Sequence, residues 1–196
     1  MKKISIILFA LLVIFGMVNM ASATFTTYDN DKSGWATATG SYLTETFSSS
    51  SLNPGISVST LFGSVSGNVW YDRVGKSPGT VLTTTFSFSP TIFAFGGNWD
   101  MTPYGPGTGI AVYADGNFVG EIANTDNGQF WGFTSTTDFT NVALKAGSGT
   151  SSPYYQETFT LDNMVYNSSA TVPEPTLLLL FGAGLLGLGF ARKFKM

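Results

Sequence analysis

Residues 109–122 read GIAVYADGNFVGEI, and this stretch decides the fold class. Apolar side chains alternate with small or polar ones on both sides of Asp115-Gly116. A two-residue connection between strands needs positive φ angles, which aspartate and glycine adopt at low cost. The stretch therefore predicts a β-hairpin.

The sequence around this hairpin has the same character, because Phe, Tyr, Trp, Thr and Val are abundant and Gly and Ser recur at short intervals. A helical turn is expected near Ser33–Ser41, and Gly96-Gly97 and Pro103–Gly109 indicate loops. Many short strands with closely spaced turns predict an all-β sandwich or jelly roll over residues 24–166. The expected strands are Tyr42–Phe47, Ile56–Leu61, Asn68–Asp72, Thr80–Phe88, Ile92–Asn98, Gly109–Ala114, Asn117–Ile122, Gln129–Thr134, Asn141–Ala146 and Glu157–Tyr166.

The composition of this body, Thr24–Thr171, excludes several classes of function. It carries four cationic side chains against eleven carboxylates, a net charge near −7 with no basic stripe, which argues against nucleic acid as a partner. The chain has neither cysteine nor histidine. Disulfides, Ser-His-Asp or Cys-His nucleophiles and His- or thiolate-bound zinc are therefore excluded.

The N-terminus has the three parts of a secretory signal peptide. Met1-Lys2-Lys3 is a positive segment, Ile4–Val18 is apolar, and Ala21-Ser22-Ala23 is an A-x-A cleavage site. We expect residues 1–23 to be a signal peptide and the mature chain to begin at Thr24. An uncleaved membrane anchor is the competing interpretation.

The C-terminus, residues 172–196, reads VPEPTLLLLFGAGLLGLGFARKFKM. Residues 176–191 carry no charge, and as a helix they would span roughly 24 Å, short of the ~30 Å hydrocarbon core of a bilayer. Basic side chains that follow can reach the headgroups on the cytoplasmic side. We expect a single transmembrane helix at 176–191, with a buried core helix as the alternative. The flanking basic residues are Arg192, Lys193 and Lys195.

The order of these parts resembles the PEP-CTERM sorting signal of Gram-negative bacteria, a tail also catalogued as an ice-binding-protein C-terminal domain. The matching segments are Val172-Pro173-Glu174-Pro175, Leu177–Phe190 and Arg192-Lys193. The resemblance implies recognition by an exosortase, a membrane-embedded protease, and processing near the Pro-Glu-Pro. It also implies an association with exopolysaccharide and biofilm. The protein would be anchored in the inner membrane before processing and would then reach the cell surface or extracellular matrix. Residues 167–171 would be a short linker.

The body resembles, more loosely, the jelly-roll ectodomains that precede such tails. The similar segments are Leu52–Gly55, Phe95–Asp100, Phe130–Phe133 and Thr160–Met164. Because jelly rolls often hold a structural calcium between their terminal strands, the resemblance raises Asp162-Asn163 as oxygen ligands.

Two motifs resemble known ligand-binding sequences but have simpler structural explanations. Gly182–Gly187 matches GxGxxG, but the βα context of a dinucleotide site is absent, so helix–helix contact explains it better. Asp29–Gly34 resembles half an EF-hand loop, yet Gly40 stands where a bidentate glutamate is required. A capped turn is the alternative there, with a calcium site as the second interpretation.

Three glutamates and four tryptophans complete the candidates. A pair among Glu45, Glu121 and Glu157 could serve glycoside hydrolysis if the two carboxylates lay about 5–10 Å apart in a cleft. The tryptophans could form sugar-stacking platforms, although core packing is expected for at least two of them. They are Trp35, Trp70, Trp99 and Trp131.

The sequence therefore predicts an exported, non-enzymatic surface or matrix protein without a cofactor, other than the calcium considered above. One alternative is a carbohydrate-binding module for exopolysaccharide, which an exposed row of aromatic residues on one sheet face would favour. The second alternative is a carboxylate-pair glycosidase.

Overall fold

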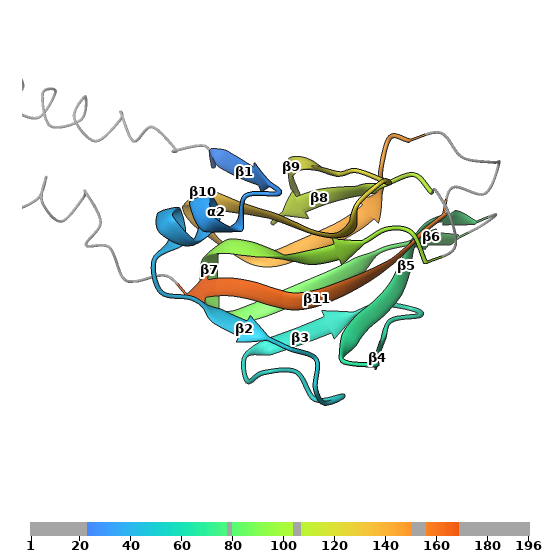
Figure 1. The fold of residues 1–196 in the computed structure, drawn as a ribbon, viewed down its shortest axis with the longest axis horizontal. Helices are drawn as coiled ribbons and strands as arrows, with labels where there is room; N and C mark the ends of the chain where they lie inside the picture. The colour runs from blue at the N-terminus through green and yellow to red at the C-terminus, as the bar shows by residue number, and fades with distance from the viewer. Residues whose placement is uncertain (1–22, 78–79, 104–106, 150–155, 169–196) are drawn as a thin grey trace, which may run out of the picture.

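Two long strands, β7 and β10, organise the fold (Figure 1). The computed structural model describes residues 23–77, 80–103, 107–149 and 156–168. The elements are β1 (Phe25–Asp29), α2 (Lys32–Thr39), β2 (Leu43–Glu45), β3 (Ile56–Ser59), β4 (Ser64–Ser66), β5 (Val69–Ser77), β6 (Thr80–Leu82), β7 (Thr84–Asp100), β8 (Ile110–Ala114), β9 (Asn117–Ile122), β10 (Asn127–Ala146) and β11 (Gln156–Ser168).

Both long strands fold back over the core. Phe86 and Phe95 of β7 would lie about 30 Å apart on a straight strand, yet their ring centroids are 6.2 Å apart. Phe133 and Phe139 of β10 stack at 5.2 Å, where a straight strand would separate them by about 20 Å. Each strand therefore runs through one layer, bends, and returns through the other.

The bends divide one hydrogen-bonded sheet into the two layers of a sandwich. In the first layer β10 and β7 are flanked by β1 on one side and by β11 with β2 and β5 on the other. In the second layer the remaining halves of β7 and β10 lie between β3 and the β8–β9 hairpin. Every pairing among the described strands is antiparallel. Because eleven strands are accompanied there by one short helix, the predicted all-β class is confirmed.

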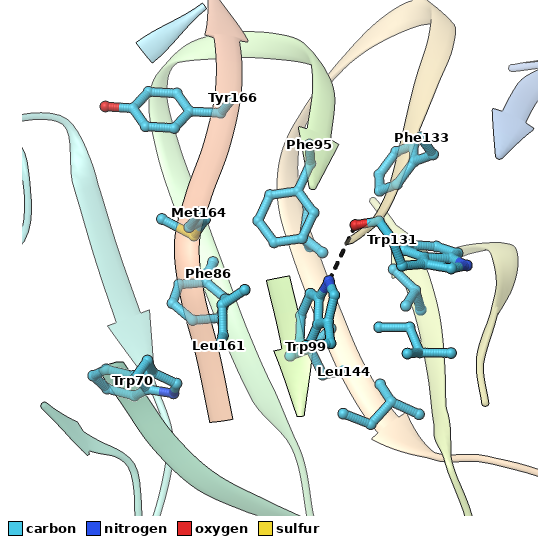
Figure 2. Close-up of a cluster of buried hydrophobic side chains, with 14 of the residues drawn as sticks. Trp70, Phe86, Phe95, Trp99, Trp131, Phe133, Leu144, Leu161, Met164 and Tyr166 are labelled. Carbon is cyan, nitrogen blue, oxygen red and sulfur yellow. Dashed lines mark hydrogen bonds between the residues drawn. The ribbon is translucent and has the colours of Figure 1, made fainter. Parts of the chain in front are cut away.

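The core between the layers is aromatic. Figure 2 shows the indole of Trp99 pointing at the backbone of Trp131, where Trp99 Nε1 donates a 3.1 Å hydrogen bond to the Trp131 carbonyl. Trp99 also contacts the rings of Phe95 and Phe159. A buried indole with its N–H satisfied contributes its full apolar surface without an orphaned donor.

The turn expected near Ser33–Ser41 is the eight-residue helix α2, which lies on the outer face of the first layer. Asp31 caps its first turn by accepting a hydrogen bond from Gly34 N at 2.8 Å. Trp35 is fully buried between α2 and the sheet, and its Nε1 donates to the Phe133 carbonyl at 3.1 Å. This outer face of the sandwich is therefore covered in part.

The Asp115-Gly116 hairpin is confirmed, with φ angles of 43° and 84°. The loop predicted at Gly96-Gly97 is wrong, because both residues lie inside β7. A Cβ on Gly96 would stand 2.9 Å from the Cα of Gly132 on β10. These glycines serve close approach of two strands rather than a turn.

The strand predictions at Thr80–Phe88 and Ile92–Asn98 fall on β6 and the continuous β7, and those at Gln129–Thr134 and Asn141–Ala146 merge into β10. Each of these long strands was predicted as two separate strands because it bends in the middle. β1 and β4 were not predicted. β11 continues to Ser168, through the first two residues of the expected linker.

The predicted sorting motif, transmembrane helix and basic flank lie outside the described residues, as does the signal peptide up to Ser22. Within the described ranges, no helix has the length and apolar character needed to cross a bilayer.

Candidate functional site

The four tryptophans do not form an exposed platform. Trp35 and Trp99 are fully buried, and Trp131 and Trp70 are 3% and 5% exposed. Three of them belong to the core between the layers, and Trp35 lies under α2. Their rings stabilise the sandwich and leave no face open to a sugar.

Glu45 has a structural role. It is 4% exposed and its carboxylate accepts hydrogen bonds from the backbone N–H groups of Phe47, at 2.7 Å, and Asn53. It therefore holds the segment after β2 against the body. Glu45 faces Met164 on β11, seven residues from Glu157, which places these two glutamates about 23 Å apart.

Glu121 and Glu157 both lie close to Gly109. Glu157 accepts a hydrogen bond from Gly109 N, and a Cβ on Gly109 would stand 3.4 Å from Oε1 of Glu121. Glu121 itself accepts bonds from the backbone N and Oγ of Ser148 at 2.7 and 3.1 Å. The backbone of residue 109 thus packs against both carboxylates, and each carboxylate accepts a hydrogen bond from a backbone N–H of the chain itself.

Glu157 is nonetheless unusual, because it is 1% exposed and its Oε1 has no hydrogen-bond partner. Burial raises its pKa from 4.5 to about 7, against backbone hydrogen bonds from Gly109 and Thr158 that act in the opposite direction. A carboxyl of this kind is neutral over part of the physiological pH range.

The residues considered for calcium are not brought together. The carboxylate of Asp31 is used to cap α2, accepting also from Ser33 Oγ at 3.0 Å. Asp29 on β1 and Asp162 on β11 are separated by β10 and β7, which corresponds to about 14 Å. The described part of the chain contains no group of three acidic side chains arranged to hold a metal ion.

The second layer instead presents a pair of accessible aromatic rings. Tyr113 on β8 and Phe118 on β9 face each other across the hairpin and meet edge to face, with centroids 5.5 Å apart. Phe118 is 57% exposed. Lys145 on β10 holds its ammonium 4.2 Å from the Tyr113 ring. These three residues form the aromatic corner, as we name it.

The aromatic corner continues into a row of small polar side chains on the same outer face. Strand register places Ser57, Ser87 and Asn141 side by side on β3, β7 and β10, and Ser87 Oγ bonds Asn141 Oδ1 at 2.8 Å. Unlike the outer face of the first layer, this face has no helix packed on it among the described residues. It offers apolar rings beside hydroxyl and amide groups.

Asp115 fixes the hairpin that carries the corner. Partial burial acts to raise its pKa, but hydrogen bonds from the backbone and side chains of Thr140 and Asn141 outweigh it and leave the pKa below 3.8. These bonds, 2.9 to 3.1 Å long, tie the β8–β9 turn to β10. The turn was predicted from the sequence and the aromatic corner was not. Its signal is the alternation in residues 109–122, where Tyr113 follows the buried Val112 and is itself only partly buried.

The family comparison concerns the end of the chain. A model of the PEP-CTERM protein-sorting motif matches residues 171–193. The chain carries a PEP-CTERM sorting motif. The match includes Val172-Pro173-Glu174-Pro175 together with Arg192 and Lys193, so the predicted resemblance of the tail is confirmed.

The comparisons of the whole chain are much weaker. No curated protein matches the sequence. Among solved structures, the chain is similar to CBM29_1, a family 29 carbohydrate-binding module from Piromyces equi, at 11% identity and a TM-score of 0.44, over 76% of this chain and 93% of that one. A likeness this slight supports no conclusion about what the PEP-CTERM chain binds.

Proposed function

We propose that this protein is an exported, non-enzymatic ectodomain of the cell surface or extracellular matrix, delivered through its PEP-CTERM tail. The tail would insert as a helix over residues 176–191, with its basic end in the cytoplasm. An exosortase-type membrane protease would then process it near Pro173-Glu174-Pro175. The matched sorting motif carries this proposal.

The body supports the non-enzymatic part of the proposal. Of the three glutamates considered for hydrolysis, Glu45 and Glu121 accept hydrogen bonds that hold loops in place, and Glu157 is enclosed. Their carboxylates act on the chain's own backbone. A role in binding or in the matrix needs no reactive group.

The motif predicts a specific effect of Glu174. Two prolines bracketing one residue disfavour a regular helix, since each lacks an N–H donor and restricts the residue before it. Glu174 would then be the one charge presented between body and bilayer. We expect Glu174→Ala, with both prolines kept, to leave membrane insertion intact and to block maturation. Immunoblots of a host carrying the exosortase should show full-length protein accumulating in the inner membrane.

Asp138→Ala is the matched control, because Asp138 is an exposed carboxylate of the body and its loss changes the net charge equally. This variant should be processed like the wild type. If the Glu174→Ala protein matures at the wild-type rate, Glu174 is not read by the protease.

A second candidate function is glycan binding, and the accessible aromatic corner is the observation that favours it. Sugar rings present apolar C–H faces that stack on aromatic side chains, while neighbouring polar groups fix their orientation. Phe118 offers the open ring, and Asn141 and Ser87 lie on the same face. In this candidate function the sugar stacks on the aromatic corner, which a polysaccharide can reach, and not on the buried tryptophans.

Affinity electrophoresis of a soluble 24–171 fragment through polysaccharide gels tests this candidate. The fragment keeps every strand of the described body, which runs from Phe25 to Ser168. If Phe118 is a binding hot spot, Phe118→Ala should weaken retention about tenfold, corresponding to about 1.4 kcal/mol. Leu61→Ala, at an apolar residue that is 66% exposed, is the control. Equal retention of both variants would remove the aromatic corner from consideration.

A further inference from the structure

The described chain begins and ends at the same end of the sandwich. Ser168 pairs with Ile92 beside the bend of β7, and Phe25 pairs with Ser135 beside the bend of β10. Figure 1 shows β1, α2 and β2 gathered at this end and β4, β5 and β6 at the other. We call the end that contains Ser168 the anchor end.

The segment between the anchor end and the expected membrane helix is short. Seven residues, 169–175, separate Ser168 from Thr176, where the expected membrane helix begins. Even fully extended, they span at most about 28 Å. If the tail is inserted, the anchor end faces the bilayer at short range, whereas the opposite end of β11 lies about 40 Å further away.

Two apolar side chains are exposed at the anchor end. Leu43 pairs with Tyr166, near the end of β11, and is 56% exposed. Tyr42 is 39% exposed and packs edge to face on Trp35 at 5.2 Å. The Asn167 side chain donates to the Thr39 carbonyl at 2.7 Å, which ties the exit of the chain to the segment that carries this pair.

Charge distinguishes the two corners of the anchor end. Asp115 and Asp138, both exposed, lie beside the bend on the second layer, away from β2. An anionic lipid surface repels these carboxylates and admits the corner with Tyr42 and Leu43, where the carboxylate of Glu45 is buried. Tyrosine is also a residue that favours the headgroup region.

We propose that Tyr42 and Leu43 contact the lipid headgroup and upper acyl region while the protein is anchored by its tail. This inference rests on the proposed membrane insertion of residues 176–191. Two side chains alone bind a bilayer weakly, but a short tether converts their contact into an intramolecular event at millimolar effective concentration. The contact orients the body and holds residues 173–175 beside the membrane surface.

The absence of cysteine from the chain permits a direct test, because a single introduced thiol can be labelled specifically. Leu43→Cys and Val81→Cys, both at exposed positions, would carry an environment-sensitive fluorophore in the mature chain, residues 24–196, which lacks the apolar signal segment. Val81 lies on β6, beyond the Gln156 end of β11, and serves as the distal control. The proteins are reconstituted into vesicles of phosphatidylcholine and phosphatidylglycerol, with spin-labelled lipid as the quencher.

We expect blue-shifted emission and several-fold stronger quenching for the label at residue 43 than for the label at residue 81. Flotation of the vesicles reports insertion of the tail separately. If the protein floats with the vesicles but both labels report an equally aqueous environment, the proposed lipid contact is wrong and the sorting proposal stands. Protein that does not float would overturn both.

Discussion

Replacing Trp99 with alanine is expected to lower the free energy of unfolding by about 3–5 kcal/mol, a large part of the stability of a domain of this size. Trp99 is fully buried, and its ring contacts Phe95 and Phe159. Removing it leaves a cavity in the core between the two layers, which the hydrogen-bonded strands cannot fully collapse to fill. Urea denaturation of the 24–171 fragment measures the change.

Trp99→Phe separates packing from hydrogen bonding. It keeps an aromatic ring but loses the bond from Nε1 to the Trp131 carbonyl, so we expect a smaller loss, on the order of 1–3 kcal/mol. Were Trp99 a sugar platform instead, alanine would abolish retention in polysaccharide gels while leaving the denaturation midpoint unchanged. That result would contradict the burial of Trp99 in the core.

Glu157 should make stability fall as the pH rises toward neutrality. Its pKa is raised from 4.5 to about 7 in the folded protein, mainly by burial, so the folded state binds more protons than the unfolded state between these values. Stability from this group is complete below about pH 4.5 and is lost as the pH passes through about 7. A shift of this size corresponds to roughly 3 kcal/mol.

Glu157→Gln should remove this dependence, because a neutral amide keeps an acceptor for Gly109 N without the cost of a buried charge. We expect it to raise the stability at pH 8 by up to roughly 3 kcal/mol and to change it little at pH 4.5. Glu121→Gln, on β9, is the control. Parallel pH profiles for wild type and Glu157→Gln would show that residue 157 does not titrate in this range.

Local patterns predicted much of the secondary structure. The Asp115-Gly116 turn and the hairpin around it were predicted because both strands and the turn are contiguous in sequence. Asn117–Ile122 was predicted with its observed bounds. β1 was missed because its apolar residues, Phe25 and Tyr28, do not recur with a period of two, and β4 was missed because it has only three residues.

The candidate site was harder to predict, because burial depends on contacts between distant segments. Asp72 shows this plainly, since its carboxylate is fully buried and accepts from Thr60 Oγ1 at 2.7 Å and Thr84 Oγ1 at 2.6 Å. Nothing in its local sequence distinguishes it from an exposed strand aspartate. Tyr113 and Phe118 are paired by the local hairpin register, but the contact of Tyr113 with the ammonium of Lys145 depends on the pairing of β8 with β10.

The sequence by itself determined the β class, the hairpin turn, the absence of thiol and imidazole chemistry, and the sorting tail, because each depends on composition or on residues close in the chain. The tertiary structure alone decided that β7 and β10 bend through both layers, that the tryptophans are buried, and that Gly109 lies against both Glu121 and Glu157. It also decided that Lys145 joins the aromatic corner and that the described chain begins and ends at the anchor end. These features arise from packing between segments tens of residues apart, where burial of aromatic surface outweighs local preference.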